Sequence, residues 1–260
     1  MKVGVVGEIH PSGYEIFDKN NIEYFVTNNV DEYHLIEKLR DVDGIVVRTA
    51  EINRNILSQT KNLKIVARHG VGYDNVDTEY LNNNKIAMAI TGTANATSVA
   101  EHVMTMMLCL TKNIFESDRL VKLGKFQEKG KLPNYFELYN KKILILGFGR
   151  IGKALAKRCS GFEMEVYVHD PFLSDEEIKN HKCIPINKEE GFKIADYISI
   201  HLPLNEETKN LISFDQFENF KSNMILINTA RGGIINEDAL YEALKDKKIF
   251  GAGVDVFEKE

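Results

Sequence analysis

Three glycines, Gly147, Gly149 and Gly152, have the spacing G-x-G-x-x-G between an apolar run and a helix-forming stretch. In a strand–turn–helix unit, Gly147 permits the tight turn, Gly149 lets the backbone approach a pyrophosphate, and Gly152 lets the helix pack on the strand. The free N–H groups of a helix that begins at Arg150 and Ile151 would face the phosphates. The segment therefore predicts a dinucleotide site.

A carboxylate ends the next apolar run along the chain. Asp170 follows residues 165–169 and lies 18 residues after Gly152, close to the roughly 20 that the dinucleotide fingerprint expects. A carboxylate at that place can accept hydrogen bonds from both ribose hydroxyls, and it would repel a 2′-phosphate. We therefore expect NAD rather than NADP, with an unrelated surface aspartate as the alternative.

Two further charged residues come directly after apolar runs. Arg231 follows residues 225–228, and Asp255 ends residues 251–255. In open α/β sheets, ligands bind outside the carboxyl ends of the strands. Both side chains are therefore candidates for ligand contacts, against the alternatives of a solvated loop arginine and a surface aspartate.

Short apolar runs that alternate with amphipathic stretches must position these residues. Runs of four to six residues rich in Val and Ile are typical of parallel strands buried on both faces, and strand–helix alternation predicts an α/β fold. The expected strands are Val3–Val6, Glu23–Val26, Gly44–Val47, Leu63–Ala67, Ile86–Ile90, Lys142–Leu146, Val166–His169, Tyr197–His201, Met224–Asn228 and Gly251–Asp255.

The two series of strands imply two lobes, residues 1–97 and 98–260. The longest helical pattern separates them, with an apolar stripe from Val99 to Leu110 that favours core or a subunit interface. The segment Gly124–Lys142 is polar and broken by Gly130 and Pro133, which predicts an exposed connection. A further helix should begin at Asn236, because acidic residues fill its first turn.

Four stretches together resemble the D-2-hydroxyacid dehydrogenase family, of the 3-phosphoglycerate dehydrogenase kind. Asn-Thr-Ala-Arg-Gly at residues 228–232, followed by Glu260, is more specific than the glycine fingerprint. The four stretches are residues 68–77, residues 98–102, residues 137–152, and residues 228–233 continued by 253–260. The resemblance implies two Rossmann-like or flavodoxin-like lobes with parallel sheets, the second of them a dinucleotide-binding domain.

The resemblance also implies a role for each site residue. Arg231 would hold the substrate carboxylate and oxo group, since a guanidinium fork donates two parallel hydrogen bonds. Backbone N–H groups of Val71 and Gly72 would hold the other side of the carboxylate. Asp255 would accept a hydrogen bond from the nicotinamide carboxamide. Glu260 would pair with a histidine that protonates the oxo group.

Further residues are expected to bind the substrate or the cofactor. Arg48, with Thr49, ends a first-lobe strand, and it either contacts a distal substrate group or is a surface arginine. The residues expected to bind NAD are Gly147, Gly149, Arg150, Ile151, Gly152, Asp170, His201, Pro203, Thr208, Thr229 and Asp255.

The sequence departs from the family at its end. Members continue past the Glu260 position to a Thr-Pro-His that carries the catalytic histidine and to a helix that completes the first lobe, whereas none of the seven histidines here follows Glu260. His69 and His201 are the possible replacements. We expect a truncated chain that binds NAD but turns over slowly, because loss of a general acid lowers rates by about 10²–10⁴.

Composition excludes several classes of protein. The chain has 260 residues, 43% hydrophobic and 27% charged, with a net charge of -5, which argues against a nucleic-acid-binding surface. No apolar run is long enough for a membrane span, and no residue set predicts a metal site. Its three cysteines lack C-x-x-C spacing and fit the cytoplasm.

Three functions remain open at this point. The first is an oxidoreductase that transfers a hydride between NAD and a small 2-hydroxy or 2-oxo acid, such as 3-phosphoglycerate of serine biosynthesis, hydroxypyruvate, glyoxylate or D-lactate. The second is a non-enzymatic NAD-binding regulator of the same fold, and the third is a degraded copy without function. The apolar stripe of the interlobe helix predicts a homodimer.

Overall fold

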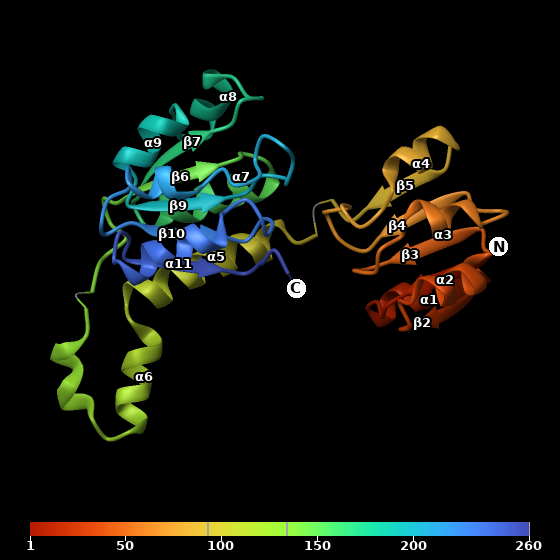
Figure 1. Cartoon of the computed structure of the whole chain (residues 1–260), viewed down its shortest axis with the longest axis horizontal. Coiled ribbons are helices and arrows are strands. Elements are labelled where there is room, and N and C mark those ends of the chain that lie inside the picture. The colour runs from red at the N-terminus through yellow and green to blue at the C-terminus, as the bar shows by residue number, and fades with distance from the viewer. Residues whose placement is uncertain (93, 134, 260) are drawn as a thin grey trace. The chain divides into compact units, whose positions relative to one another are not determined.

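The computed structural model describes residues 1–92, 94–133 and 135–259, and the chain divides into two units, residues 1–95 and 96–260. Figure 1 shows both units as parallel sheets with helices against them. The first unit contains β1 (Lys2–Val6), α1 (Pro11–Lys19), β2 (Glu23–Thr27), α2 (Glu32–Leu39), β3 (Gly44–Val47), α3 (Arg54–Ser58), β4 (Ile65–Arg68), α4 (Thr78–Asn83) and β5 (Ala87–Ile90).

The second unit holds the longer series of elements. It contains α5 (Ala96–Thr111), α6 (Ile114–Lys122), the 3-10 helix η1 (Phe126–Lys131), β6 (Lys142–Leu146), α7 (Arg150–Gly161), β7 (Glu165–His169), α8 (Asp175–Asn180), β8 (Ile184–Pro185), α9 (Lys188–Ile194), β9 (Tyr197–Ile200), α10 (Phe214–Phe217), β10 (Ile225–Asn228), α11 (Glu237–Lys245) and β11 (Gly251–Val254). Its Asn236 caps α11 by accepting a hydrogen bond from the Ala239 N–H.

The first unit has a five-stranded sheet in the order β2-β1-β3-β4-β5. Alternate residues such as Ile45 and Val66 face a core built with α2, α3 and α4. On the opposite face, Ile65 is 37% exposed, and Ala87 and Ala89 are also exposed. This order is that of the flavodoxin-like doubly wound sheet.

The second unit has a six-stranded parallel sheet in the order β11-β10-β9-β6-β7-β8. Numbered from its own first strand, the order is 6-5-4-1-2-3, which is the dinucleotide-binding arrangement read from the other edge. One face packs a core with α5 and α7, and the other packs a core with α9, α10 and α11. The order reverses between β6 and β9, where ligands bind in such sheets. The expected α/β fold with two parallel-sheet lobes is confirmed.

Several element boundaries differ from the sequence prediction. The fourth strand begins at Ile65 rather than Leu63, since its register with β3 starts at the pair Gly44 and Ile65. No pattern in the sequence predicts the two-residue strand β8, which pairs with β7 over Tyr167 and Val168 only. The segment expected as an exposed connection contains η1, and α6 precedes it.

Figure 1 shows α6 and η1 extending away from the body of the second unit. Both carry large apolar side chains in solvent, among them Phe115 at 73% and Phe126 at 54% exposure. An arm that buries so little of its own apolar surface is typical of an interaction surface.

Candidate cofactor and substrate site

The turn after β6 is built around backbone contacts that only glycine permits. Gly147 has φ +88°, and a Cβ there would lie 2.6 Å from the carbonyl oxygen of His201 at the end of β9. Gly147 donates its N–H to the His169 carbonyl at the end of β7, 3.0 Å away. A Cβ on Gly152 would strike the Gly147 carbonyl oxygen. The three central strands therefore meet at this turn, and α7 lies directly against it.

The middle of the same turn is anchored on one side and open on the other. Phe148 is buried in the core under α7 and contacts the His181 ring edge-on. Gly149 is exposed, and a Cβ built on it would meet no described atom within 4 Å. No side chain caps α7 among the described residues, although its N-cap is Gly149. A helix start of this kind can receive a phosphate.

Asp170 is tied to the glycine turn by hydrogen bonds. One carboxylate oxygen accepts from the Phe148 N–H at 2.8 Å, and the other accepts from the Phe172 N–H at 3.0 Å. The carboxylate is therefore held at the carboxyl end of β7, beside the turn. This is the place at which an acid can bind a ribose.

His201 directly follows β9, and its ring atom Nδ1 is buried. The ring atom Nε2 lies 2.9 Å from the Ser199 hydroxyl, and Nδ1 is buried with no hydrogen-bond partner among the described residues. Burial lowers the pKa of His201 to about 4. The ring is therefore neutral at pH 7, which argues against the alternative that His201 supplies the proton in catalysis.

Asn228 shapes the turn that carries Arg231. This buried residue accepts from the Ala230 N–H at 3.0 Å and donates to the Arg231 carbonyl at 3.0 Å. The Arg231 guanidinium donates to the Ala230 carbonyl at 2.6 Å. The Thr229 hydroxyl is buried, and no described atom satisfies it. Asn228 is not among the site residues expected from the sequence, although an Asn that begins a turn is a known signal.

The chain passes close to this turn a second time near its end. A Cβ on Gly232 would strike the backbone of Phe257, so only glycine fits there. Glu258 donates its N–H to the Glu237 carboxylate at 2.7 Å. Residues 257–258 are thus held against the Arg231 turn, and Glu260 lies outside the described residues.

The loop after β9 holds the remaining expected cofactor residues. Thr208 donates its hydroxyl to the Pro203 carbonyl at 2.6 Å, and its N–H donates to the Asn205 side chain at 2.9 Å. These bonds close a compact loop at the same sheet edge as His201. At the neighbouring strand end, Asp255 donates its N–H to the Asn228 carbonyl at 3.0 Å.

The expected substrate residues of the first unit lie at the carboxyl edge of that unit's own sheet. Arg48 follows β3 and is exposed, with Thr49 beside it. Val71 and Gly72 are half-buried in the loop after β4, close in sequence to His69, whose N–H donates to the Val47 carbonyl at 2.8 Å.

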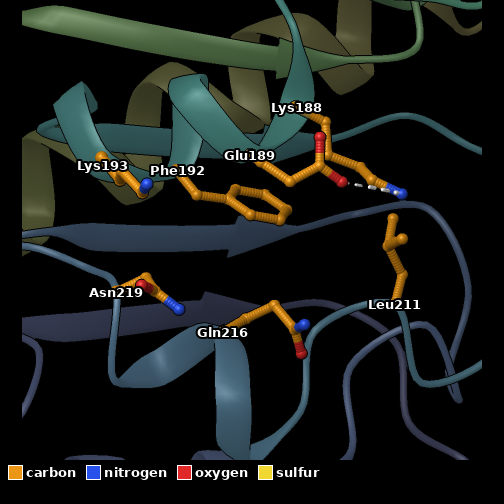
Figure 2. A pocket seen from close by; sticks show the side chains of 7 residues that line it. All are labelled: Lys188, Glu189, Phe192, Lys193, Leu211, Gln216 and Asn219. Carbon is orange, nitrogen blue, oxygen red and sulfur yellow. Dashed lines mark ion pairs between the residues drawn. The ribbon is translucent and has the colours of Figure 1, made fainter.

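A groove of about 320 Å³ lies elsewhere on the second unit, between α9 and the segment 211–219. Figure 2 shows Phe192 in it and Lys188 paired with Glu189, 3.7 Å apart. None of its lining residues belongs to the expected cofactor set, and we assign it no ligand. The described residues contain no cluster of metal-ligating side chains and no helix able to cross a membrane.

Comparison with known proteins agrees with this geometry. Residues 104–260 match the model of the family described as "D-isomer specific 2-hydroxyacid dehydrogenase, NAD binding domain". The chain belongs to this family. The resemblance stated from the sequence is therefore confirmed, and residues 104–260 form the family's NAD-binding domain.

The relatives differ in their names. The chain is 36% identical to a D-3-phosphoglycerate dehydrogenase of Archaeoglobus fulgidus over 100% of its own length and 49% of that protein. It is 35% identical to a hydroxypyruvate reductase of Thermotoga maritima, over 94% of this chain and 78% of that one. The chain thus spans about half the length of the phosphoglycerate dehydrogenases that it matches.

Solved structures show the same fold. A D-lactate dehydrogenase of Aquifex aeolicus, solved with NAD and lactic acid, has a TM-score of 0.87 at 27% identity, over 100% of this chain and 78% of that one. An acyclic imino acid reductase solved with NADPH has a TM-score of 0.91 at 25% identity, over 100% of this chain and 84% of that one.

The residues present fit a bound dinucleotide. The space at Gly149 and the uncapped start of α7 can receive a pyrophosphate. The buried His201 Nδ1 and Thr229 hydroxyl lack partners among the described residues, and buried polar groups in native proteins are normally satisfied. A ligand with polar atoms at this sheet edge would satisfy them.

Proposed function

We propose that the protein is an NAD-dependent oxidoreductase acting on a small D-2-hydroxy acid and its 2-oxo acid. One observation carries the proposal. The Asn228 side chain folds the turn that presents Arg231 at the sheet edge where the glycine turn lies. An arginine fork beside a dinucleotide site suits a planar carboxylate substrate. When bound, NAD supplies the hydride acceptor or donor.

Each site residue has a proposed task. Arg231 binds the substrate carboxylate and oxo group, and the backbone N–H groups of Val71 and Gly72 bind the carboxylate from the first unit. Asp255 accepts from the nicotinamide carboxamide. Glu260 orients the histidine that exchanges a proton with the substrate oxygen. Arg48 contacts the distal substrate group.

The glycine turn and its neighbours hold the cofactor in this proposal. The N–H groups of Arg150 and Ile151 bind the pyrophosphate, and Asp170 binds the adenosine ribose. The neutral ring of His201 and the Thr229 hydroxyl contact the cofactor from the ends of β9 and β10. The compact loop from Pro203 to Thr208 contacts the cofactor next to His201.

The substrate class follows the relatives' names. Matching relatives are called D-3-phosphoglycerate dehydrogenase, hydroxypyruvate reductase and glyoxylate reductase, and each name contains a small 2-hydroxy or 2-oxo acid. We propose the same class here, with a place in serine biosynthesis if 3-phosphoglycerate is the substrate. A cytoplasmic location fits the free thiols of Cys109, Cys159 and Cys183.

The test is NADH oxidation with hydroxypyruvate, glyoxylate, pyruvate and 3-phosphohydroxypyruvate. It uses the product of the whole gene and the 260-residue chain in parallel. The 260-residue chain should bind NADH through its glycine turn. In the whole product, Arg231→Gln should lower kcat/KM by about 10²-fold or more through loss of the charged fork.

The matched control is Arg158→Gln on α7, whose guanidinium is bound to Glu101 on the surface. It should leave turnover unchanged. NADH binding without turnover of any 2-oxo acid by the whole product would favour the alternative, a non-enzymatic NAD-binding regulator.

We also propose that the protein forms a homodimer. The support is the arm of α6 and η1, in which Phe115, Val121, Leu123 and Phe126 are more than half exposed. A second copy offers the same apolar surface, as a two-fold interface requires. Light scattering should give a dimer mass, and Phe115→Asp should give a monomer that still binds NADH.

A further inference from the structure

Helix α5 lies along β11 in a regular register. A Cβ built on Gly251 would lie 3.4 Å from Leu110, and one built on Gly253 would lie 2.9 Å from the Met106 sulfur. Four helical residues rise about 6 Å, and two strand residues advance about 6.6 Å. One helical turn therefore matches one two-residue step along the strand, in the opposite chain direction.

The next step in this register joins a histidine and an aspartate. One turn before Met106 is His102, and two residues after Gly253 is Asp255. The His102 Nε2 atom lies 3.4 Å from an Asp255 carboxylate oxygen. The glycines of β11 bring the helix close enough for this contact, because any side chain at position 253 would meet Met106.

The pair lies where a ligand can reach it. The two side chains are 46% and 53% exposed, and the Asp255 backbone is fixed by its N–H bond to the Asn228 carbonyl. Exposed ion pairs add little to the stability of a fold. The contact with His102 instead restricts the rotation of a carboxylate whose backbone is already held at the ligand-binding edge.

We propose that His102 is a positioning residue for the cofactor's nicotinamide end. It holds the Asp255 carboxylate in the orientation in which it accepts from the carboxamide. This rests on the proposed function, which gives Asp255 that contact. An acceptor held in place before binding loses less side-chain freedom when the ligand arrives. Asp255 lies within the stretch that matches the family's NAD-binding model, and His102 lies just before it.

The test compares two ligands on the 260-residue chain. NADH carries the nicotinamide, whereas ADP-ribose ends at the second ribose and lacks it. His102→Ala should weaken NADH binding about two- to fivefold, the range expected for loss of one exposed charged contact. It should leave ADP-ribose binding unchanged. His102→Gln, whose amide can still donate to Asp255, should recover part of the loss.

The controls separate positioning from a structural role. Thr105→Ala, an exposed change on the same helix, should alter neither affinity. In an Asp255→Ala background, His102→Ala should have no further effect on NADH. Equal losses for NADH and ADP-ribose, or an unchanged NADH affinity, would overturn the assignment. If the unsubstituted chain binds ADP-ribose but not NADH, the proposed function fails and the assignment of His102 fails with it.

Discussion

Both units have a glycine turn after their first strand, but only the turn of the second unit has the dinucleotide-binding pattern. In each unit a glycine with positive φ directly follows the first strand, Gly7 at +83° and Gly147 at +88°. Each glycine donates its N–H to the carbonyl that ends the neighbouring strand, Thr27 at 2.9 Å and His169 at 3.0 Å. The shared sheet geometry therefore sets where a turn begins, not what it binds.

The two units are also similar at the opposite edge of each sheet, where the first strand begins. Asp43 accepts from the N–H that begins β1 at 2.8 Å, and Asp196 accepts from the N–H that begins β6 at 2.9 Å. The second oxygen of each acid binds a lysine, Lys64 at 2.6 Å and Lys221 at 2.8 Å. These contacts lower the pKa of the Asp43 carboxyl, chiefly through its hydrogen bond from Lys64.

The two units differ in the residues that directly follow this glycine. In the first unit the chain continues to His10, whose ring caps α1 by accepting from the Ser12 N–H. In the second unit Gly149 leaves the start of α7 without a side-chain cap. A capped helix start has its N–H groups partly satisfied, whereas an uncapped one can bind an anion. The two units thus differ between the glycine and the next helix, with three residues there in the first unit and two in the second.

The units also differ in how their sheets are covered. Both faces of the second sheet pack buried cores, while the first sheet has a core on one face and exposes Ile65, Ala87 and Ala89 on the other. The second unit therefore covers both faces of its own sheet, whereas part of the second face of the first sheet is exposed among the described residues.

The largest expected difference between the two units is the loss of stability when alanine replaces Gly7 or Gly147. Gly7→Ala meets only the Arg48 side chain, at 3.6 Å, so it should cost about 1–2 kcal/mol for the left-handed backbone alone. Gly147→Ala adds a clash with the His201 backbone, and should cost about 2–5 kcal/mol in total.

Calorimetry measures both changes, since two units need not unfold in one transition. Gly147→Ala should also abolish NADH binding, whereas Gly7→Ala should preserve it. Equal destabilisation by the two substitutions would contradict the view that the second turn is wedged against β9 and the first is not.

Local patterns in the sequence predicted most of the strands and the glycine turn. The apolar runs gave the long strands to within one or two residues, as at Gly44–Val47, because each strand is buried on at least one face. The glycine spacing and Asp170 predicted a turn and a carboxylate that the structure brings into direct contact. Boundaries were less predictable where the register with a neighbouring strand sets them, as at Ile65, which pairs with Gly44.

Long-range contacts account for what the sequence did not reveal. The pairing of His102 with Asp255 depends on the register between a helix and a strand some 150 residues apart in the chain. Ser199 is marked in the sequence as a polar residue inside an apolar strand, but its bond to His201 depends on how the chain folds after the strand. The short strand β8 has neither length nor alternation to mark it.

A smaller, pH-dependent effect tests the difference between the residues that follow the middle strands. Arg48 and His201 occupy matching places, each donating its N–H to the last residue of the first strand, but Arg48 is exposed while the His201 ring is buried with its pKa lowered to about 4. An unfolded histidine binds a proton below about pH 6.5, whereas folded His201 does not until about pH 4. Acid in this window therefore favours the unfolded second unit, by about 2–3 kcal/mol at pH 4.5 relative to pH 7.5.

Thermal unfolding at the two pH values should show that acid lowers the stability of His201→Asn less than that of the unsubstituted chain. Arg48→Gln should lose as much stability in acid as the unsubstituted chain. The same acid loss in all three proteins would mean that the buried ring takes up its proton without unfolding, and that the second unit's turn is less closed than its contacts indicate.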